Sequence, residues 1–203
     1  EKVPFLQGEL LGDDEDERYA EYSADTERYT LYEHCLRALV KGTTQGKHGL
    51  PLMGGGDWND GMNRVGIKGQ GESIWLGWFL YATQVAFADV ADDIAQPDDA
   101  LWLRSNAAGL QEALEAHGWD GEWYRRAYYD DGTPLGSAQN AECRIDSIAQ
   151  SWGVLSGAAD PTRAQQAMNA VCENLVRQDD RLILLFTPPF NQTRRDPGYI
   201  KGY

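Results

Sequence analysis

The amino-acid sequence predicts a mainly α protein. Apolar residues recur at helical spacing in five segments, glycine or proline stands at most of their ends, and one short stretch has the pattern of an extended hairpin. Helices of roughly thirteen to twenty residues, joined by loops of very unequal length, are typical of an α/α toroid whose long loops build a site.

The amino-terminal part is expected to lead into the first two helices. Within residues 1–24, a short apolar start precedes the acidic run at 13–17, which we expect to be a solvated loop. The first helix is predicted over 26–41, where apolar side chains recur at helical spacing and glycines follow. The second, over 72–92, is apolar on nearly every face, as expected of a helix buried between neighbours.

The second half of the chain contains the other three predicted helices. Residues 98–117 form an amphipathic stripe, with Asp98 placed to cap the helix start. Residues 123–137 combine aromatic, charged and turn residues, which predicts a short extended hairpin. Further helices are predicted over 144–156 and from Asp160-Pro161 onward, where an N-cap precedes a first-turn proline. Residues 182–203 show no closing helix.

Composition narrows the classes of partner and compartment. The 203 residues, 42% of them hydrophobic, suffice for a sizeable core, and the net charge of −14 disfavours nucleic acid and anionic membranes. Seven Trp and ten Tyr suit a sugar ligand, although core packing accounts for most of them. Three widely spaced cysteines and no signal-peptide pattern predict a cytoplasmic location, with any inner-membrane anchor of a parent protein outside this chain.

The segment Gly54–Asn63 is the strongest candidate for a site. Its three successive glycines permit positive φ, and Asp57, Trp58 and Asp60 offer acceptors for sugar hydroxyls around a flat apolar face. Cleavage of a glycosidic bond needs a carboxylic acid that protonates the leaving oxygen. We expect one of the two carboxylates to be catalytic and the other to support the loop or bind hydroxyls. The loop fails the EF-hand pattern, so no metal is predicted.

Several residues outside this loop have two open interpretations. Arg125-Arg126 and Asp130-Asp131 form either the salt-bridged rim of a hairpin or a ligand contact. Glu142 and Asp146 lie one helical turn apart beside a helix start, where carboxylates suit the helix dipole. Gln150 is a further candidate for sugar contact.

Six strings of residues carry a resemblance to a known family. The chain resembles the inverting glycoside phosphorylases of the cellobiose phosphorylase family, glycoside hydrolase family 94, and within it the carboxy-terminal phosphorylase-like domain of cyclic β-1,2-glucan synthases. The strings are 48–53, 56–63, 71–76, 124–132, 142–152 and 198–203.

The resemblance implies an (α/α)6 barrel and phosphorolysis of a β-glucosidic bond with inversion. It assigns Asp60 as the general acid and places Trp58 against the transferred sugar. The other candidates for substrate contact are Asp57, Asn59, Arg125, Arg126, Glu142, Gln150, Tyr199 and Tyr203, the last two on the acceptor side. Inorganic phosphate is then a co-substrate that needs no base, and no cofactor is expected.

The family's upstream sugar-binding segment and downstream phosphate-binding segment fall outside this chain. We therefore expect residues 1–203 to be one partial catalytic domain of a longer parent chain, able to associate through exposed apolar surface. Two alternatives stay open. One is a water-using inverting glucosidase, with Glu142 or Asp146 as its base. The other is a fragment that binds sugar without activity of its own.

Overall fold

The chain is described by a computed structural model that covers residues 1–12, 15 and 18–202. Its contacts divide it into two compact units, Glu1–Gly42 and Thr43–Tyr203, each described here by itself. Most of the predicted acidic loop at 13–17 and the predicted site residue Tyr203 lie outside the described residues. The single domain expected over 1–203 stays a prediction.

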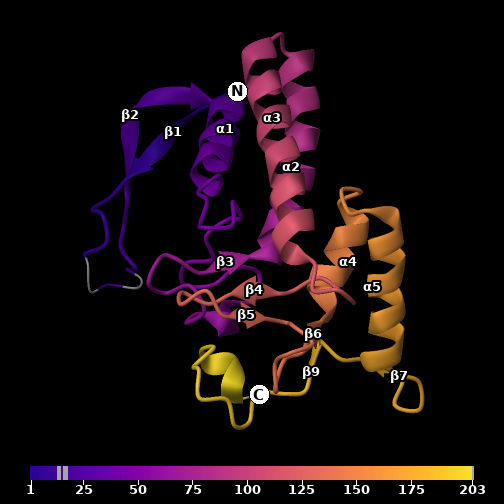
Figure 1. The fold of residues 1–203 in the computed structure, drawn as a ribbon. Helices are drawn as coiled ribbons and strands as arrows, with labels where there is room; N and C mark the ends of the chain where they lie inside the picture. The colour runs from indigo at the N-terminus through magenta and orange to yellow at the C-terminus, as the bar shows by residue number, and fades with distance from the viewer. Residues whose placement is uncertain (13–14, 16–17, 203) are drawn as a thin grey trace. The chain divides into compact units, whose positions relative to one another are not determined.

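The first unit is a β-hairpin followed by a helix (Figure 1). Strands β1 (Lys2–Gln7) and β2 (Ser23–Thr30) pair in antiparallel fashion, and α1 spans Leu31–Gly42. The predicted helix start at residue 26 is therefore wrong, and the two strands were not predicted from the sequence. The helix begins later because Thr30 and Glu33 form a capping box, in which each side chain accepts the other's backbone N–H.

A pair of long helices, α2 (Ile74–Asp93) and α3 (Pro97–Ala113), lies side by side in the second unit (Figure 1). A π-helical turn, η2 (Leu114–Gly118), continues α3. Trp78 and Leu103 have no exposed surface, but Phe79 and Val90 are about two-fifths exposed, so the burial of α2 between neighbours holds for only part of the helix. By length and composition α2 is apolar enough to cross a membrane, a property that buried core helices of soluble proteins share.

The cap of α3 also differs from the prediction. Gln96 occupies the N-cap and Pro97 the first turn, so Asp98 lies inside the helix rather than at its cap. An acidic side chain in the first turn still interacts favourably with the helix dipole.

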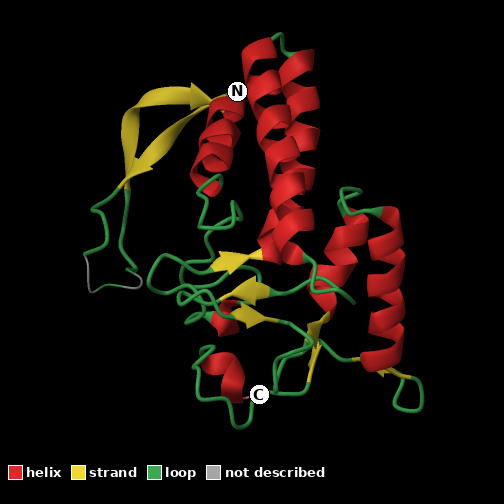
Figure 2. Cartoon of the chain, in the orientation of Figure 1, coloured by secondary structure: helices red, strands yellow, loops and turns green. Residues whose placement is uncertain are grey.

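A small sheet lies beside the long helices (Figure 2). It is formed by β3 (Glu72–Ser73), β4 (Ala127–Tyr128) and β5 (Pro134–Leu135), in the order β3-β4-β5. The β4–β5 pair confirms the hairpin predicted near 123–137, and β3 is an additional partner. A core cluster that includes Met62, Val65 and Phe190 packs with residues of this sheet.

The remaining elements complete the second unit. Helix α4 spans Ser147–Leu155 and α5 spans Pro161–Asn174, with Asp146 and Asp160 as their N-caps. Strand β6 (Ile145–Asp146) pairs with β9 (Phe186–Thr187), and β7 (Val176–Arg177) pairs with β8 (Leu182–Ile183). Two 3-10 turns are η1 (Asp60–Met62) and η3 (Tyr199–Gly202).

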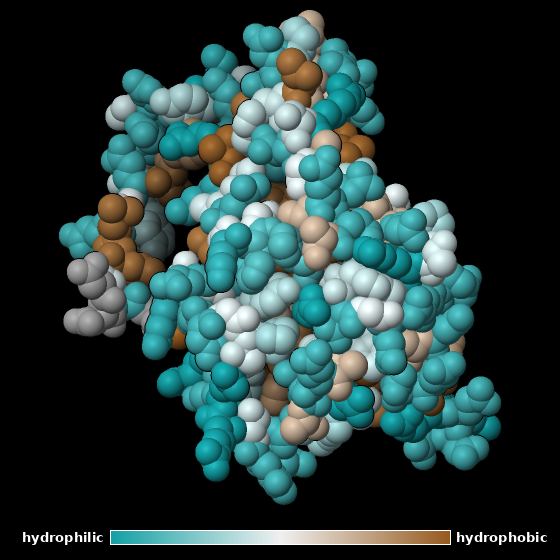
Figure 3. Space-filling view, in the orientation of Figure 1, coloured by the Kyte–Doolittle hydropathy of each residue, from teal (hydrophilic) through white to brown (hydrophobic). Residues whose placement is uncertain are grey.

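The mainly α class and the five α-helices within the described residues are confirmed. Hydrophilic side chains cover most of the visible face of this unit (Figure 3).

Candidate active site

The loop that contains Asp57 and Asp60 is held in one shape by its own polar side chains. Gly54 and Gly56 have φ values of 57° and 129°, which only glycine adopts readily. Asp57 accepts a hydrogen bond from the backbone N–H of Asn59, and Asn59 accepts one from the N–H of Gly61. These two bonds lead the chain into η1, which begins at the candidate acid Asp60.

The two carboxylates of this loop have opposite surroundings. The Asp57 side chain has no exposed surface and accepts two hydrogen bonds of 2.6 Å from Arg126, whereas Asp60 is exposed. Burial by itself raises the pKa of Asp57, but the charge and hydrogen bonds of Arg126 hold that pKa below its ordinary value. Asp57 is therefore a buried, ionised support, and Asp60 is free to meet a ligand.

Asp60 lines a cleft of about 620 Å³. The loop contributes Asn59 to Gly61, and the carboxy-terminal part of the chain contributes the opposite wall, which includes Phe186 and Tyr199. Tyr199 is about half exposed, and its backbone N–H donates to Asn63 in the loop at 3.4 Å. The structure thus brings together the predicted acid and the predicted acceptor-side tyrosine.

Glycine is required where the two walls of the cleft meet. Gly198 has a φ of 114°, and a Cβ at this position would lie 2.6 Å from the carbonyl oxygen of Gly61 and 2.7 Å from the nitrogen of Asn63. The absent side chain lets the tail approach the loop closely, so that Tyr199 reaches the cleft.

Trp58 does not line this cleft among the described residues. Its side chain is 59% exposed. Its contact with a transferred sugar stays a prediction.

The two arginines of the predicted rim have separate partners inside the protein. Arg126 has no exposed surface and pairs with Asp57, so the structure places it in the interior rather than at a surface that a ligand could reach. Arg125 forms an ion pair of 2.6 Å with Asp120 and donates to the carbonyl oxygens of His117 and Trp119. The pairing of these arginines with Asp130 and Asp131, as one salt-bridged rim, is therefore not found among the described contacts.

Gln150 and Glu142, two other candidates from the sequence, form hydrogen bonds within the protein. Gln150 is fully buried and exchanges hydrogen bonds with the backbone N–H and C=O of Tyr124, and its contact with a sugar stays a prediction. Glu142 accepts backbone N–H groups from the three residues Asn191 to Thr193, at 2.6 to 2.9 Å. Glu142 therefore stabilises the loop that follows β9.

Asp146 lies at a helix start, where the sequence predicts that a carboxylate interacts favourably with the helix dipole. It is the N-cap of α4, accepts from the N–H groups of Ile148 and Ala149, and has no exposed surface. Burial raises the pKa of Asp146 to about 6, even though the nearby charge of Arg126 lowers it.

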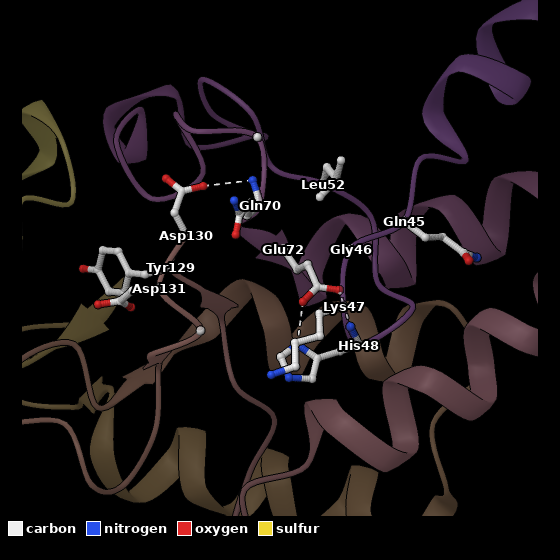
Figure 4. A pocket seen from close by; sticks show the side chains of 12 residues that line it. Gln45, Gly46, Lys47, His48, Leu52, Gln70, Glu72, Tyr129, Asp130 and Asp131 are labelled. Carbon is white, nitrogen blue, oxygen red and sulfur yellow. Dashed lines mark hydrogen bonds and ion pairs between the residues drawn. The ribbon is translucent and has the colours of Figure 1, made fainter.

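A second cleft of about 570 Å³ lies around His48, Glu72 and Asp130 (Figure 4). Glu72 is nearly fully buried and accepts hydrogen bonds from the His48 ring and from the backbone N–H groups of His48 and Leu50. Asp130 accepts from the backbone N–H groups of Lys68, Gln70 and Gly71. These carboxylates stabilise the loops that surround this cleft.

Sequence reasoning missed Ser73, which links the loop to a helix. Its hydroxyl donates to Asp57 and accepts from the backbone N–H of Leu76 as the N-cap of α2. A serine directly before an apolar helical run is an N-cap signal, so this residue was detectable.

Comparison with known proteins places this geometry in a family. Residues 4–203 match the catalytic domain of the glycosyl hydrolase 94 superfamily. The chain is 53% identical to cyclic beta-(1,2)-glucan synthase NdvB of Rhizobium meliloti (strain 1021), over 100% of this chain and 7% of that protein. It is 36% identical to solabiose phosphorylase of Paenibacillus borealis, over 86% of this chain and 23% of that protein.

A third relative is cellobionic acid phosphorylase of Neurospora crassa, 35% identical over 88% of this chain and 22% of its own length. The chain thus spans less than a quarter of each of these relatives. Because the family match covers nearly every residue from the first hairpin to the tail that lines the cleft, the chain belongs to the glycosyl hydrolase 94 superfamily.

Proposed function

We propose that this chain carries the general acid of an enzyme that breaks β-glucosidic bonds by phosphorolysis with inversion, releasing glucose 1-phosphate. The acid is Asp60. The observation that carries this proposal is that Asp60 is the one carboxylate among the described residues lining its cleft, while its neighbour Asp57 is buried and paired with Arg126.

The reaction requires one proton donor on the protein. Asp60 donates its proton to the glycosidic oxygen as the bond between that oxygen and the anomeric carbon breaks. A phosphate oxygen bonds to the same carbon from the opposite face, which inverts its configuration. The carboxylate of Asp60 is then protonated again from solvent. Phosphate is already an anion, so no protein base has to activate it.

The glucan synthase relative points to β-1,2-glucan as the substrate class. The chain is 53% identical to that protein over its whole length, whereas the two phosphorylases named above, which differ from each other in substrate, are 35–36% identical. Trp58, with its large exposed surface, is proposed to lie against the transferred glucose. The packed helices are proposed to form part of an (α/α)6 barrel.

A water-using inverting glucosidase is the competing function. Such an enzyme needs a second carboxylate about 6.5–9.5 Å from the acid, with room for a water molecule between them. Asp146, one candidate base, is fully buried beside Arg126, and Glu142, the other, is held by three backbone N–H groups. Neither lines the cleft of Asp60 among the described residues, which favours phosphorolysis.

The test uses the full-length protein that contains this chain, with β-1,2-linked glucose oligosaccharides as substrates. Asp60→Asn removes the proton but keeps the shape of the side chain, so release of glucose 1-phosphate should fall by about 10²–10⁴-fold. The measurement is glucose 1-phosphate formed in the presence of phosphate, together with the thermal unfolding curve of the variant. Glu112→Gln, at an exposed carboxylate on α3, is the matched control and should keep normal activity.

Each competing function predicts a different result. Near-normal activity of a folded Asp60→Asn variant contradicts the acid assignment. Glucose release that does not depend on phosphate indicates the water-using glucosidase. Binding of oligosaccharide without turnover by the full-length protein indicates a sugar-binding role.

A further inference from the structure

Arg126 forms a charge pair with Asp57 that is closed off from solvent. Both side chains have no exposed surface, and the two Nη atoms donate to the two carboxylate oxygens at 2.6 Å each. This fork-to-fork geometry fixes the orientation of both groups as well as their distance. Removal of either partner leaves an uncompensated charge in the interior, which is strongly unfavourable.

The backbone of Arg126 is itself held on both sides. Its N–H donates to the carbonyl oxygen of Leu135 at 2.8 Å, and its carbonyl oxygen accepts from the N–H of Ile74 at 3.2 Å. Gly136 packs so closely against it that a Cβ there would lie 2.5 Å from the Arg126 nitrogen. The guanidinium therefore projects from a fixed point at the start of β4.

Two helix starts meet at the same guanidinium. Ser73, the N-cap of α2, donates its hydroxyl to Asp57 and lies 3.3 Å from an Arg126 Nη atom. Asp146, the N-cap of α4, has a carboxylate oxygen 3.5 Å from the Arg126 Nε. The loop of the candidate acid is thus tied to the ends of two helices through one arginine.

The charge of Arg126 is shared unequally between its two acidic neighbours. Both carboxyl groups are buried, which raises the pKa of each. The short hydrogen bonds from Arg126 hold the pKa of Asp57 below its ordinary value, while the pKa of Asp146 stays raised at about 6. Asp57 is therefore the principal ionised partner of Arg126. The attraction between these two side chains acts on the loop that contains Asp57.

We propose that Arg126 and Asp57 are positioning residues that fix the loop from Asp57 to Asp60, so that the Asp60 carboxyl group faces the cleft. This inference rests on the proposed role of Asp60 as the general acid. Arg126 cannot touch a ligand from its buried position, so its effect passes through Asp57 and the turn that Asp57 and Asn59 form. The pair should therefore affect proton transfer more than substrate binding.

The first test variant is Arg126→Lys in the full-length protein, which keeps the charge but loses the fork. A displacement of about 1 Å in a catalytic group can cost about 100-fold in rate. We expect kcat for phosphorolysis of a β-1,2-linked glucose oligosaccharide to fall by about that factor, with KM changed less than about threefold. The control is Arg104→Lys, at an exposed ion-paired arginine of α3, which should leave both constants unchanged.

A second substrate separates loss of positioning from general damage. The second substrate is β-glucosyl fluoride, whose fluoride leaving group departs with little need of a proton. Phosphorolysis of this substrate by Arg126→Lys should therefore stay close to the wild-type rate. Ser73→Ala, which removes one hydrogen bond to Asp57 and keeps the ion pair, should lower the oligosaccharide rate by a smaller factor and also leave the fluoride rate close to that of the wild type. It serves as the milder variant should Arg126→Lys fail to fold.

The outcomes distinguish the positioning role of Arg126 and Asp57 from the proposed role of Asp60 as the general acid. Asp60→Asn should lose the oligosaccharide reaction and keep the fluoride reaction; if it keeps both or loses both equally, the acid assignment fails. If Asp60→Asn behaves as expected and the folded Arg126 and Ser73 variants lose both substrates equally, or lose neither, the positioning role is overturned. A rise in KM with unchanged kcat also overturns it.

Discussion

At the scale of single residues, Asp146 is a buried carboxyl group whose surroundings disfavour its charge. It has no exposed surface, and its pKa of about 6 lies well above the ordinary value of 3.8. As pH rises through this window, the unfolded chain releases the Asp146 proton before the folded chain does. The stabilising contribution of this group is thus fully present below about pH 3.8 and is lost as pH rises through about 6.

Asp146→Asn should remove this dependence on pH. The amide keeps an oxygen for the N–H groups at the start of α4, but it carries no charge to bury beside Arg126 and Asp57. The free energy of unfolding of the variant, minus that of the wild type, should increase by about 2 kcal/mol from pH 4 to pH 7.5. Urea unfolding at several pH values measures it. Asp93→Asn, at an exposed position of α2, is the control, and a flat difference for Asp146→Asn would contradict the assignment.

The sequence predicted part of this residue-level picture. It indicated that one of the two loop carboxylates supports the loop, because two neighbours in a tight loop tend to point differently, and Asp57 has this role. The catalytic role of the other carboxylate stays a prediction. The sequence did not indicate that Arg126 is fully buried. The partner of Arg126 lies 69 residues away in the chain, and no local pattern predicts that a charged side chain will be placed in the interior.

At the scale of elements, the α2–α3 pair supplies much of the apolar packing of the second unit. Leu103 of α3 has no exposed surface, whereas Leu101 on the same helix is 70% exposed. The two leucines therefore have the same helical backbone and differ in burial. They form a matched pair for measuring how far this packing stabilises the fold.

Leu103→Ala should lower the free energy of unfolding by about 2–5 kcal/mol, because it removes buried methyl groups and leaves a cavity. Leu101→Ala should change it by less than about 0.5 kcal/mol, since that side chain remains largely in water when the chain folds. Chemical denaturation of both variants measures the difference. Equal losses for the two would show that α3 does not pack through the face of Leu103.

Elements with strong end signals were predicted well, and those without them were not. Helix α5 begins at Pro161 as expected, because Asp160 and Pro161 are an N-cap and a first-turn proline. Strand β2 was read as the start of a helix. Its residues Ser23–Thr30 are mostly polar, so the two-residue apolar period that identifies a strand is missing.

At the scale of the whole chain, apolar side chains remain exposed on several elements of the second unit. They include Phe79 and Val90 on α2, Val154 and Leu155 on α4, and Ile183 in β8. Phe79 and Val90 are separated by close to three helical turns, so they lie on the same side of α2. Apolar surface of this kind favours association with other protein surfaces.

The isolated chain should therefore self-associate as its concentration rises, and Val90→Lys should weaken that association. Sedimentation velocity at a series of concentrations measures it. Asp93→Lys on the same helix changes the net charge by more, yet keeps the apolar surface, and should have the smaller effect. A chain that stays monomeric at all concentrations, or an equal effect of the two variants, would contradict the prediction.

The cleft at Asp60 is assembled from two stretches that are far apart in the sequence, one at Asn59–Gly61 and the other from Leu185 to Ile200. Closing so long a loop costs conformational entropy that only the final contacts repay, so such contacts form late in folding. Helices α2 and α3 adjoin each other in the sequence and can pair much earlier. A newly made chain should thus form this cleft in its last folding step, so that a complete cleft marks a completed fold.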